Sequence, residues 1–140
     1  MAELRALTVL QPWANAIAYG TKRVENRGWL PPANFIGARI AIHAGKRHDY
    51  NARLAEGCSW PEAAAVRYGA VLAVATVTGS CNVVLGCDGD CSPWAVRGQD
   101  HWHLADVRPL AEPVPCRGAL GLWRLPGDVE KAVLAQMGPA

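Results

Sequence analysis

The chain has 140 residues, a formal net charge of +2 and a hydrophobic fraction of 51%. This length predicts one domain, 1–140, that buries its own core, and the small net charge excludes the strongly basic histone-like and ribosomal classes. No secretory signal is visible and no apolar run is long enough to cross a bilayer, so we expect a cytoplasmic protein with no membrane partner. Five cysteines are an odd number, which favours reduced thiols over a fully paired disulfide framework.

The first two predicted elements are a strand and a short helix. Residues 7–10 form an apolar run of strand type. Pro12 suits the first turn of a helix, because its fixed φ and missing N–H do no harm there. Gly20 can adopt the left-handed conformation that ends a helix, so the helix spans about two turns.

A charged segment follows the helix. If residues 24–29 form a strand, Glu25, Arg27 and Trp29 lie on one face, because side chains alternate along a strand. Lys22 can join them only from the turn before that strand. Residue types alone favour an exposed salt bridge that contributes about 0–1 kcal/mol. The alternative is a ligand cleft, in which the cations hold a phosphate or carbonyl and the indole stacks on a base.

The middle of the chain predicts one strand, a cationic loop and two helices. Residues 37–44 alternate between apolar and polar positions, which is typical of a half-buried strand. The loop after this strand carries Lys46 and Arg47, which together with His43 form the densest cationic patch of the chain. Capping signals then predict two helices that cover the strands. These helices span residues 49–54 and 59–68.

The second half predicts three more strands and a last helix. Residues 71–78 are continuously apolar and often β-branched, which is typical of a strand buried on both faces. Strands also fit 101–105 and 119–125, and an apolar stripe predicts a helix over 128–137. The segment 79–99 is long and irregular, and such loops in a compact domain are usually functional or mobile.

The six tryptophans divide into two groups by their neighbours. Three lie in apolar surroundings and are expected in the core; these are Trp13, Trp60 and Trp123. The other three lie among charges or in the long loop, where an exposed ring can stack on a base for about 1–3 kcal/mol; these are Trp29, Trp94 and Trp102. Trp94 is the best candidate for a lid or platform.

The long loop also carries three cysteines. With Cys81, Cys87 and Cys91, the nearby His101 and His103 provide the donor types of a zinc site. The spacing lacks the CxxC knuckle that makes zinc signatures specific. We therefore interpret these residues as reduced thiols and ordinary strand histidines, and predict no metal and no cofactor.

Recognisable motifs lie near the two ends of the chain. The first group is Leu10-Gln11-Pro12-Trp13-Ala14 followed by Gly20-x-Lys22-x-x-Glu25-x-Arg27-x-Trp29. The second group is Trp102-x-Leu104-x-Asp106-x-x-Pro109-Leu110 followed by Gly118-x-x-Gly121-Leu122-Trp123. Together they resemble the ASCH family over about residues 7–125. The resemblance implies an α+β fold, namely a PUA-like β-barrel with short helices packed around it.

This resemblance also implies that the segment from Lys22 to Trp29 lines a cleft. We therefore favour the ligand cleft over the exposed salt bridge that residue types alone indicate. We predict a nucleic-acid-binding protein whose partner is RNA, or else DNA or a modified nucleoside, because cations neutralise the backbone and aromatic rings stack on bases. The candidate binding residues are Gln11, Trp13, Lys22, Glu25, Arg27, Trp29, His43, Lys46, Arg47, Trp94 and Trp102.

The alternative is a small hydrolase. One branch of the family resembles a bacterial amidohydrolase that deacetylates N4-acetylcytidine with a lysine and a threonine three positions later, and another branch is ribonuclease-like. Lys22 matches that lysine, but Glu25 stands where the threonine is expected. A buried lysine with a lowered pKa and a carboxylate acting as general base could still hydrolyse a substrate. Lys22 and Glu25 are therefore the candidate catalytic residues.

A third alternative is a protein-interaction module, since ASCH domains are also fused to transcription coactivators. We find no second domain in this sequence through which it would act as an adaptor. We therefore rank this alternative last.

Overall fold

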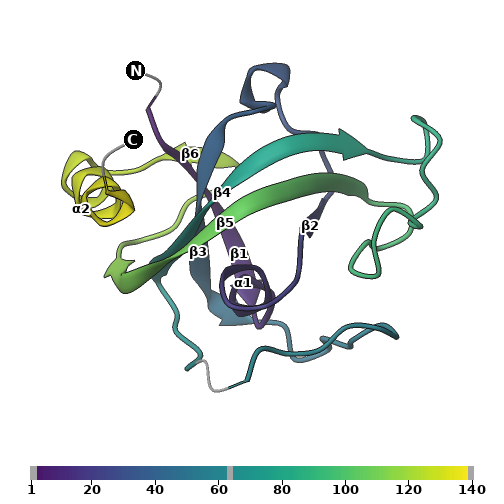
Figure 1. Ribbon diagram of the computed structural model, residues 1–140, viewed down its shortest axis with the longest axis horizontal. Coiled ribbons are helices and arrows are strands. Elements are labelled where there is room, and N and C mark those ends of the chain that lie inside the picture. The colour runs from purple at the N-terminus through teal and green to yellow at the C-terminus, as the bar shows by residue number, and fades with distance from the viewer. Residues whose placement is uncertain (1–2, 63–64, 139–140) are drawn as a thin grey trace.

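One mixed sheet of six strands organises the computed structural model, which describes residues 3–62 and 65–138 (Figure 1). The elements in chain order are β1 (Arg5–Gln11), α1 (Trp13–Ala18), β2 (Val24–Arg27), the 3-10 turn η1 (Ala33–Phe35), β3 (Arg39–His48), β4 (Ala70–Cys81), β5 (Asp100–Pro115), β6 (Leu122–Arg124) and α2 (Gly127–Met137). The strands lie in the order β2-β5-β4-β3-β1-β6. Only β1 and β3 run parallel among the strands that the structure describes.

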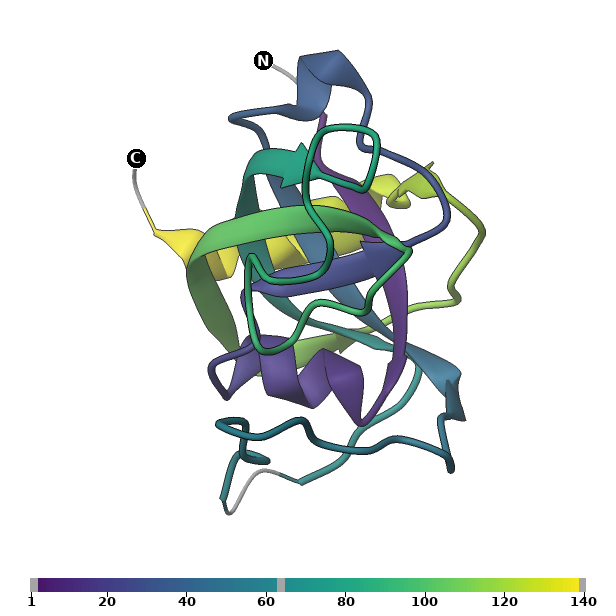
Figure 2. The ribbon, with the colours of Figure 1, turned by 90° about the vertical axis from the view of Figure 1, so that its right-hand side faces the viewer.

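The sheet is strongly curved but its ends are not joined. The long strands β4 and β5 bend over α1 (Figure 2), and register shifts interrupt their pairing at three places. Such bulges increase the bend and twist of a strand. Within the described ranges, the edge strands β2 and β6 are not paired with each other. The α+β class is therefore confirmed, whereas closure into a PUA-like β-barrel stays a prediction.

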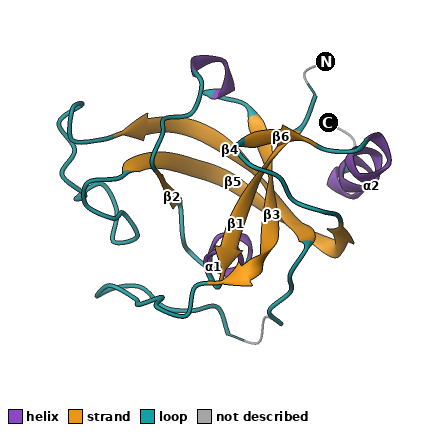
Figure 3. Ribbon diagram, turned by 180° about the vertical axis from the view of Figure 1, so that it is seen from behind, coloured by secondary structure: helices purple, strands orange, loops and turns teal. Residues whose placement is uncertain are grey.

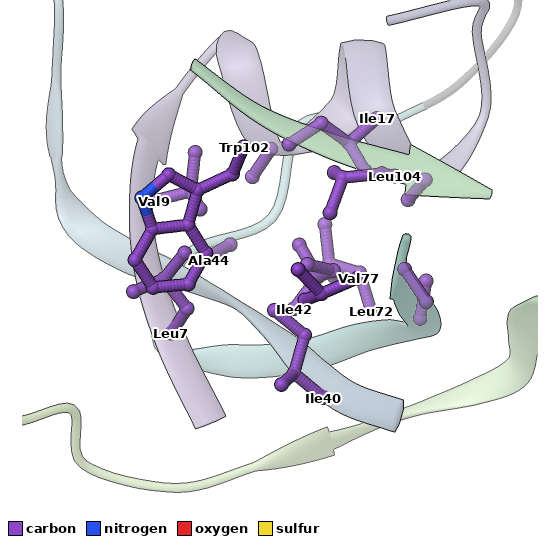
Figure 4. Packing of buried hydrophobic residues seen from close by; sticks show 14 of the residues in the cluster. Leu7, Val9, Ile17, Ile40, Ile42, Ala44, Leu72, Val77, Trp102 and Leu104 are labelled. Carbon is purple, nitrogen blue, oxygen red and sulfur yellow. The ribbon is translucent and has the colours of Figure 1, made fainter. Parts of the chain in front are cut away.

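The main core lies between the sheet and α1. Aliphatic side chains that each contribute about 1.5–3 kcal/mol on burial make up most of it. Members from the strands and from α1 are Leu7, Val9, Ile17, Ile40, Ile42, Ala44, Leu72, Val77, Trp102 and Leu104 (Figure 4). Trp102, expected as an exposed stacking ring, is completely buried here, and its Nε1 donates a hydrogen bond to the Trp29 carbonyl at 2.8 Å. Its place in the core excludes it from direct ligand contact.

A second core lies on the opposite face of the sheet. Val71 and Leu72 are both fully buried although they point to opposite faces, so the prediction that this strand is buried on both sides is confirmed. Val129 and Val133 of α2 belong to this second core together with Val71, and α2 contacts β5. Figure 3 shows α2 beside β6, at the end of the sheet away from α1.

The segment between β3 and β4 is irregular, and the two helices predicted there are wrong. Residues 49–54 and the described part of 59–68 form no helix, while residues 63 and 64 lie outside the described ranges. Instead, Gln11 Nε2 donates to the Arg67 carbonyl at 2.7 Å and Asn15 Nδ2 donates to the Ala65 carbonyl at 3.1 Å. Both carbonyls lie in the last turn of the predicted helix, where a helix leaves carbonyls without an internal partner, and here side chains from β1 and α1 bind them. The segment consequently runs alongside α1 (Figures 1 and 2).

The helices that do form are short. Neither α1 nor α2 is long and apolar enough to cross a membrane, and the described residues contain no other α-helix. α1 contacts β1, β3, β4 and β5 and thus holds the inner face of the bent sheet.

His43 joins three parts of the chain instead of facing a ligand. Its Nδ1 lies 3.2 Å from Thr8 Oγ1, and its Nε2 lies 2.8 Å from the Cys116 carbonyl. Trp123 Nε1 also donates to Thr8 Oγ1 at 2.9 Å. The side chain is 1% exposed, and this burial lowers the pKa of His43. The predicted binding role of His43 is corrected to a structural one, because its ring nitrogens are both used inside the protein.

Gly118 packs directly against the side chains of His43 and Thr8. We expect Gly118→Ala to lower the free energy of unfolding by about 1–3 kcal/mol. An added Cβ would lie 2.8 Å from His43 Cε1 and 2.9 Å from Thr8 Oγ1, neither of which is free to move. Urea denaturation measures the change. Gly79→Ala is the matched control, since a Cβ there meets no atom within 4 Å. Equal stabilities of the two variants would contradict the role assigned to this contact.

Candidate functional site

A cavity of about 540 Å³ opens where β2 approaches β1. β1, β2, the start of α1 and the loop 82–99 between β4 and β5 all contribute to its lining, as does the segment after β3. Six of the predicted binding residues line it, which are Trp13, Lys22, Glu25, Arg27, Trp29 and Trp94. Its size lies within the range of small-molecule sites, about 300–1,000 Å³.

The turn after α1 places Lys22 at the cavity. An added Cβ on Gly20 would lie 2.8 Å from the Ala16 carbonyl oxygen, so this close turn requires glycine. Lys22 N donates to the Ala16 carbonyl at 3.1 Å, and Arg23 Nη1 donates to the carbonyls of Ile17 and Gly20, each at 3.2 Å. Lys22 therefore enters the cavity from the turn, ahead of β2.

A buried carboxylate lies between two cations at one wall of the cavity. Lys22 Nζ lies 3.3 Å from Glu25 Oε1, and Arg27 Nε donates to Glu25 Oε2 at 2.9 Å. Arg27 Nη2 donates to the Thr8 carbonyl at 2.5 Å. β6 pairs only with Arg5–Leu7 of β1, so the Thr8 carbonyl lies just beyond the end of that ladder. Arg27 thus links two strands, β1 and β2, that are not neighbours in the sheet.

Burial sets the electrostatics of this group. The Lys22 side chain is 2% exposed and also donates to the Val24 carbonyl. Desolvation lowers the pKa of Lys22, because the ammonium loses its hydration shell, while the Glu25 carboxylate partly opposes that shift. Lys22 Nζ also lies 5.8 Å from the centre of the Trp13 ring. The site therefore offers a lysine that releases its proton more readily than a free one.

Aromatic rings form further parts of the cavity lining. Trp13 and Trp94 meet edge to face with ring centroids 6.4 Å apart. Trp13 Nε1 donates to Asp49 Oδ2 at 2.9 Å, which fixes the orientation of the indole. On another side, Trp29 packs edge to face on the buried Trp102 at 4.8 Å. Trp13, expected in the core, is instead only partly buried and lines the cavity.

The other predicted binding residues do not line the cavity. Gln11 is fully buried, and its Nε2 donates to Asn15 Oδ1 at 2.8 Å and to the Arg67 carbonyl. Lys46 and Arg47 are exposed at the end of β3, which continues through the segment expected to be a loop. Together with His43 and Trp102, these residues are therefore placed apart from the site.

Sequence reasoning missed several residues of the cavity, among them Thr8, Asn26, Asp49, Arg53 and Gln99. The hydrogen bonds of Asn26 explain its place in the cavity lining. Its Nδ2 donates to the Trp94 carbonyl at 3.0 Å, and its Oδ1 accepts from Val96 N at 2.7 Å. Asn26 thereby holds the loop 82–99 against β2. The only sequence signal for Asn26 is its place inside the motif from Lys22 to Arg27.

Four potential metal ligands, three thiols and one imidazole, meet beside the site. The donor atoms of Cys81, Cys87, Cys91 and His101 all lie within 4.8 Å of one another. Cys87 and Cys91 reach the hairpin formed by β4 and β5 through turns of the loop 82–99. The spacing of the cysteines in the sequence did not predict these turns. Among the described residues, this is the group whose donor set suits a metal ion.

Comparisons with known proteins agree on one fold. The family model for the ASCH domain matches residues 7–113. A crystal structure of ASCH from Zymomonas mobilis aligns with a TM-score of 0.60 and 18% identity, covering 95% of this chain and 94% of the other. A crystal structure of a mutant ZmASCH protein from the same organism, with phenylalanine in place of a tyrosine, aligns with a TM-score of 0.58 and 17% identity, covering 96% and 98%. No curated protein matches the chain.

We expect Glu25→Gln to lower the free energy of unfolding by about 3–5 kcal/mol, because the substitution leaves the buried Lys22 without its compensating charge. Chemical denaturation followed by circular dichroism measures the loss. Asp106→Asn is the control: Asp106 pairs with Arg108 at 3.3 Å on an exposed surface, and asparagine accepts its positive φ of 48°. That pair should contribute about 0–1 kcal/mol. A loss at Glu25 no larger than at Asp106 would show that the buried group is not coupled as described.

Proposed function

Because the chain belongs to the ASCH domain family, whose members are generally RNA-binding, we propose that it binds single-stranded RNA and holds one base in the cavity beside Lys22, Glu25 and Arg27. The observation that carries the proposal is the combination of a buried, charge-paired carboxylate with indole walls in one hollow. Double-stranded nucleic acid keeps its bases stacked, whereas a single strand can turn a base out into such a hollow.

The indoles supply the stacking surface. Trp94 and Trp13 line the same cavity with their rings near perpendicular. Trp94 is 9% exposed, and this exposed part belongs to the cavity wall, beside the more open Trp13. Trp29 lies on another side with its ring supported by Trp102. Rings held by such contacts lose little freedom when a base binds, which favours affinity.

The charged group supplies recognition of base edges. Glu25 uses one oxygen for Lys22 and the other for Arg27, and a carboxylate still has lone pairs to accept from a base amino group. Arg27 donates through Nε and Nη2 to the described residues, which leaves the donors of Nη1 for a carbonyl or phosphate oxygen. Donors and acceptors thus lie side by side, as reading a base edge requires.

The cations near the cavity are few. Arg53 lines it, while Lys46 and Arg47 lie outside it at the end of β3. With a net charge of only +2, the protein contacts few phosphates. We therefore infer that the protein binds short RNA segments and that its affinity for them depends only modestly on salt concentration.

Trp94→Leu should weaken binding of short single-stranded RNA by about 5- to 150-fold, the equivalent of about 1–3 kcal/mol of lost stacking. Leucine keeps apolar contact with Val24 and Ala16, the neighbours of Trp94 in its small core. Fluorescence anisotropy with labelled oligonucleotides at low salt measures the affinity. Tyr50→Leu is the control, because Tyr50 is 89% exposed and lies outside the cavity. Absence of binding to every RNA tested, or equal losses in both variants, would refute the proposal.

A second candidate function is hydrolysis of an acylated nucleoside in the same cavity. The lowered pKa of Lys22 favours it, since a lysine that gives up its proton more readily is better suited to act as base or nucleophile. Glu25, 3.3 Å away, can accept a proton from water in place of the hydroxyl that the family's amidohydrolase pattern carries. Both residues then act on one substrate carbonyl at the cavity wall.

Incubation with N4-acetylcytidine and other acylated nucleosides tests this function. If the protein is a hydrolase, turnover measured by chromatography should fall by at least about 100-fold in Lys22→Ala, because proton transfer by a positioned group contributes about 10²–10⁴-fold. Arg39→Ala, an exposed residue at the start of β3, should keep full turnover. Equal rates in wild type and Lys22→Ala would leave binding as the function.

A further inference from the structure

Three sulfurs and one imidazole nitrogen converge where β4 and β5 meet. Cys81 ends β4 and faces His101, near the start of β5, as a registered pair of the ladder. Cys87 and Cys91 reach the same point from the loop 82–99. All four donor atoms lie within 4.8 Å of one another, and all three cysteines are free thiols.

The distances fit one tetrahedral ion. His101 Nδ1 lies 3.5 Å from the Sγ of Cys87, 3.6 Å from that of Cys81 and 3.7 Å from that of Cys91. A tetrahedral zinc with Zn–S near 2.3 Å and Zn–N near 2.0–2.1 Å has N···S edges of about 3.5–3.6 Å. The nitrogen therefore already lies at nearly the right separation from each sulfur.

The histidine is also oriented as a metal ligand. His101 is fully buried, and its Nε2 lies 2.6 Å from the Val96 carbonyl, so Nε2 carries the proton and donates it. The lone pair of Nδ1 then points at the three sulfurs. Metal-bound histidines commonly donate their other N–H to a carbonyl in this way. His103 Nε2, 3.2 Å from Cys81 Sγ, lies close enough to support that sulfur from outside the group.

We propose that Cys81, Cys87, Cys91 and His101 bind one zinc ion. Against the expectation drawn from spacing, which favoured ordinary thiols and no metal, the fold brings the four donors together. Three thiolates and an imidazole suit zinc, and they release three protons to solvent as the metal binds. A disulfide between two of the cysteines would leave the third thiol and the oriented histidine unexplained.

The zinc has a structural role. Four protein ligands close a tetrahedral site and leave no position for water or substrate, which separates it from catalytic zinc. It ties the loop 82–99 to both strands of the hairpin, and the same loop carries Trp94 and Val96 to the cavity wall. Figure 2 shows this loop in front of β2. The metal therefore holds one wall of the cavity without touching what binds there.

Elemental analysis of untagged protein should find one zinc per chain. Cys87→Ser and Cys91→Ser should lose it, whereas Cys58→Ser and Cys116→Ser should retain it, because those two cysteines lie outside the group. Addition of Co²⁺ to metal-free, reduced wild-type protein should produce thiolate charge-transfer bands and the visible bands of a tetrahedral ion. This titration tests the site even where a serine variant fails to fold.

Several results would overturn the proposal. These are wild-type protein that binds neither zinc nor Co²⁺ while reduced, full metal content in Cys91→Ser, and a mass two units below that of five thiols, which would reveal a disulfide. Iron in place of zinc, with visible absorption as isolated, would also overturn it. All of these readouts need no RNA, so they stand apart from the outcome of the binding experiments.

Discussion

The bond from Arg27 to the Thr8 carbonyl is the constraint on which the site depends. It joins β2 and β1, which are separated by three other strands in the sheet, at the point where the β6 ladder has ended. Arg27 reaches this carbonyl while it also holds Glu25, and Glu25 in turn compensates the buried charge of Lys22. One chain of charged contacts thereby positions the strands and forms one wall of the cavity. The side chains that hold the strands together are thus also those on which the proposed binding rests.

The loop 82–99 is held to this arrangement from two directions. Asn26 binds the backbone of Trp94 and Val96 from β2, and His101 binds the Val96 carbonyl from β5. A long loop without helix or strand would otherwise be costly to order. Both attachments lie within a few residues of Trp94, so they fix the indole in the cavity wall. The proposed zinc ion adds a third attachment, through Cys87 and Cys91 of the same loop.

Several sequence predictions failed because local signals omit tertiary partners. Capping residues favoured helices between β3 and β4, but Gln11 and Asn15 bind backbone carbonyls of that segment. Trp102 was expected to be exposed because of the charged residues near it in the sequence, yet it occupies the core. His43 belongs to a cationic run in sequence, while in space it is a buried joint whose lowered pKa favours the neutral ring. Each residue was judged by its sequence neighbours, and the fold gave it other neighbours.

The motifs of the amino-acid sequence by themselves identified the family, and the resemblance to that family implied the α+β class. Alternation and apolar runs, which are local properties of a chain, placed most of the strands. Motif spacing also placed Lys22, Glu25 and Arg27 near one another, since a turn and a strand of few residues can separate them very little. Only the tertiary structure decided which aromatic rings face the cavity and which fill the core. It also decided that Cys87 and Cys91 meet His101, because the path of an irregular loop depends on contacts far apart in the sequence.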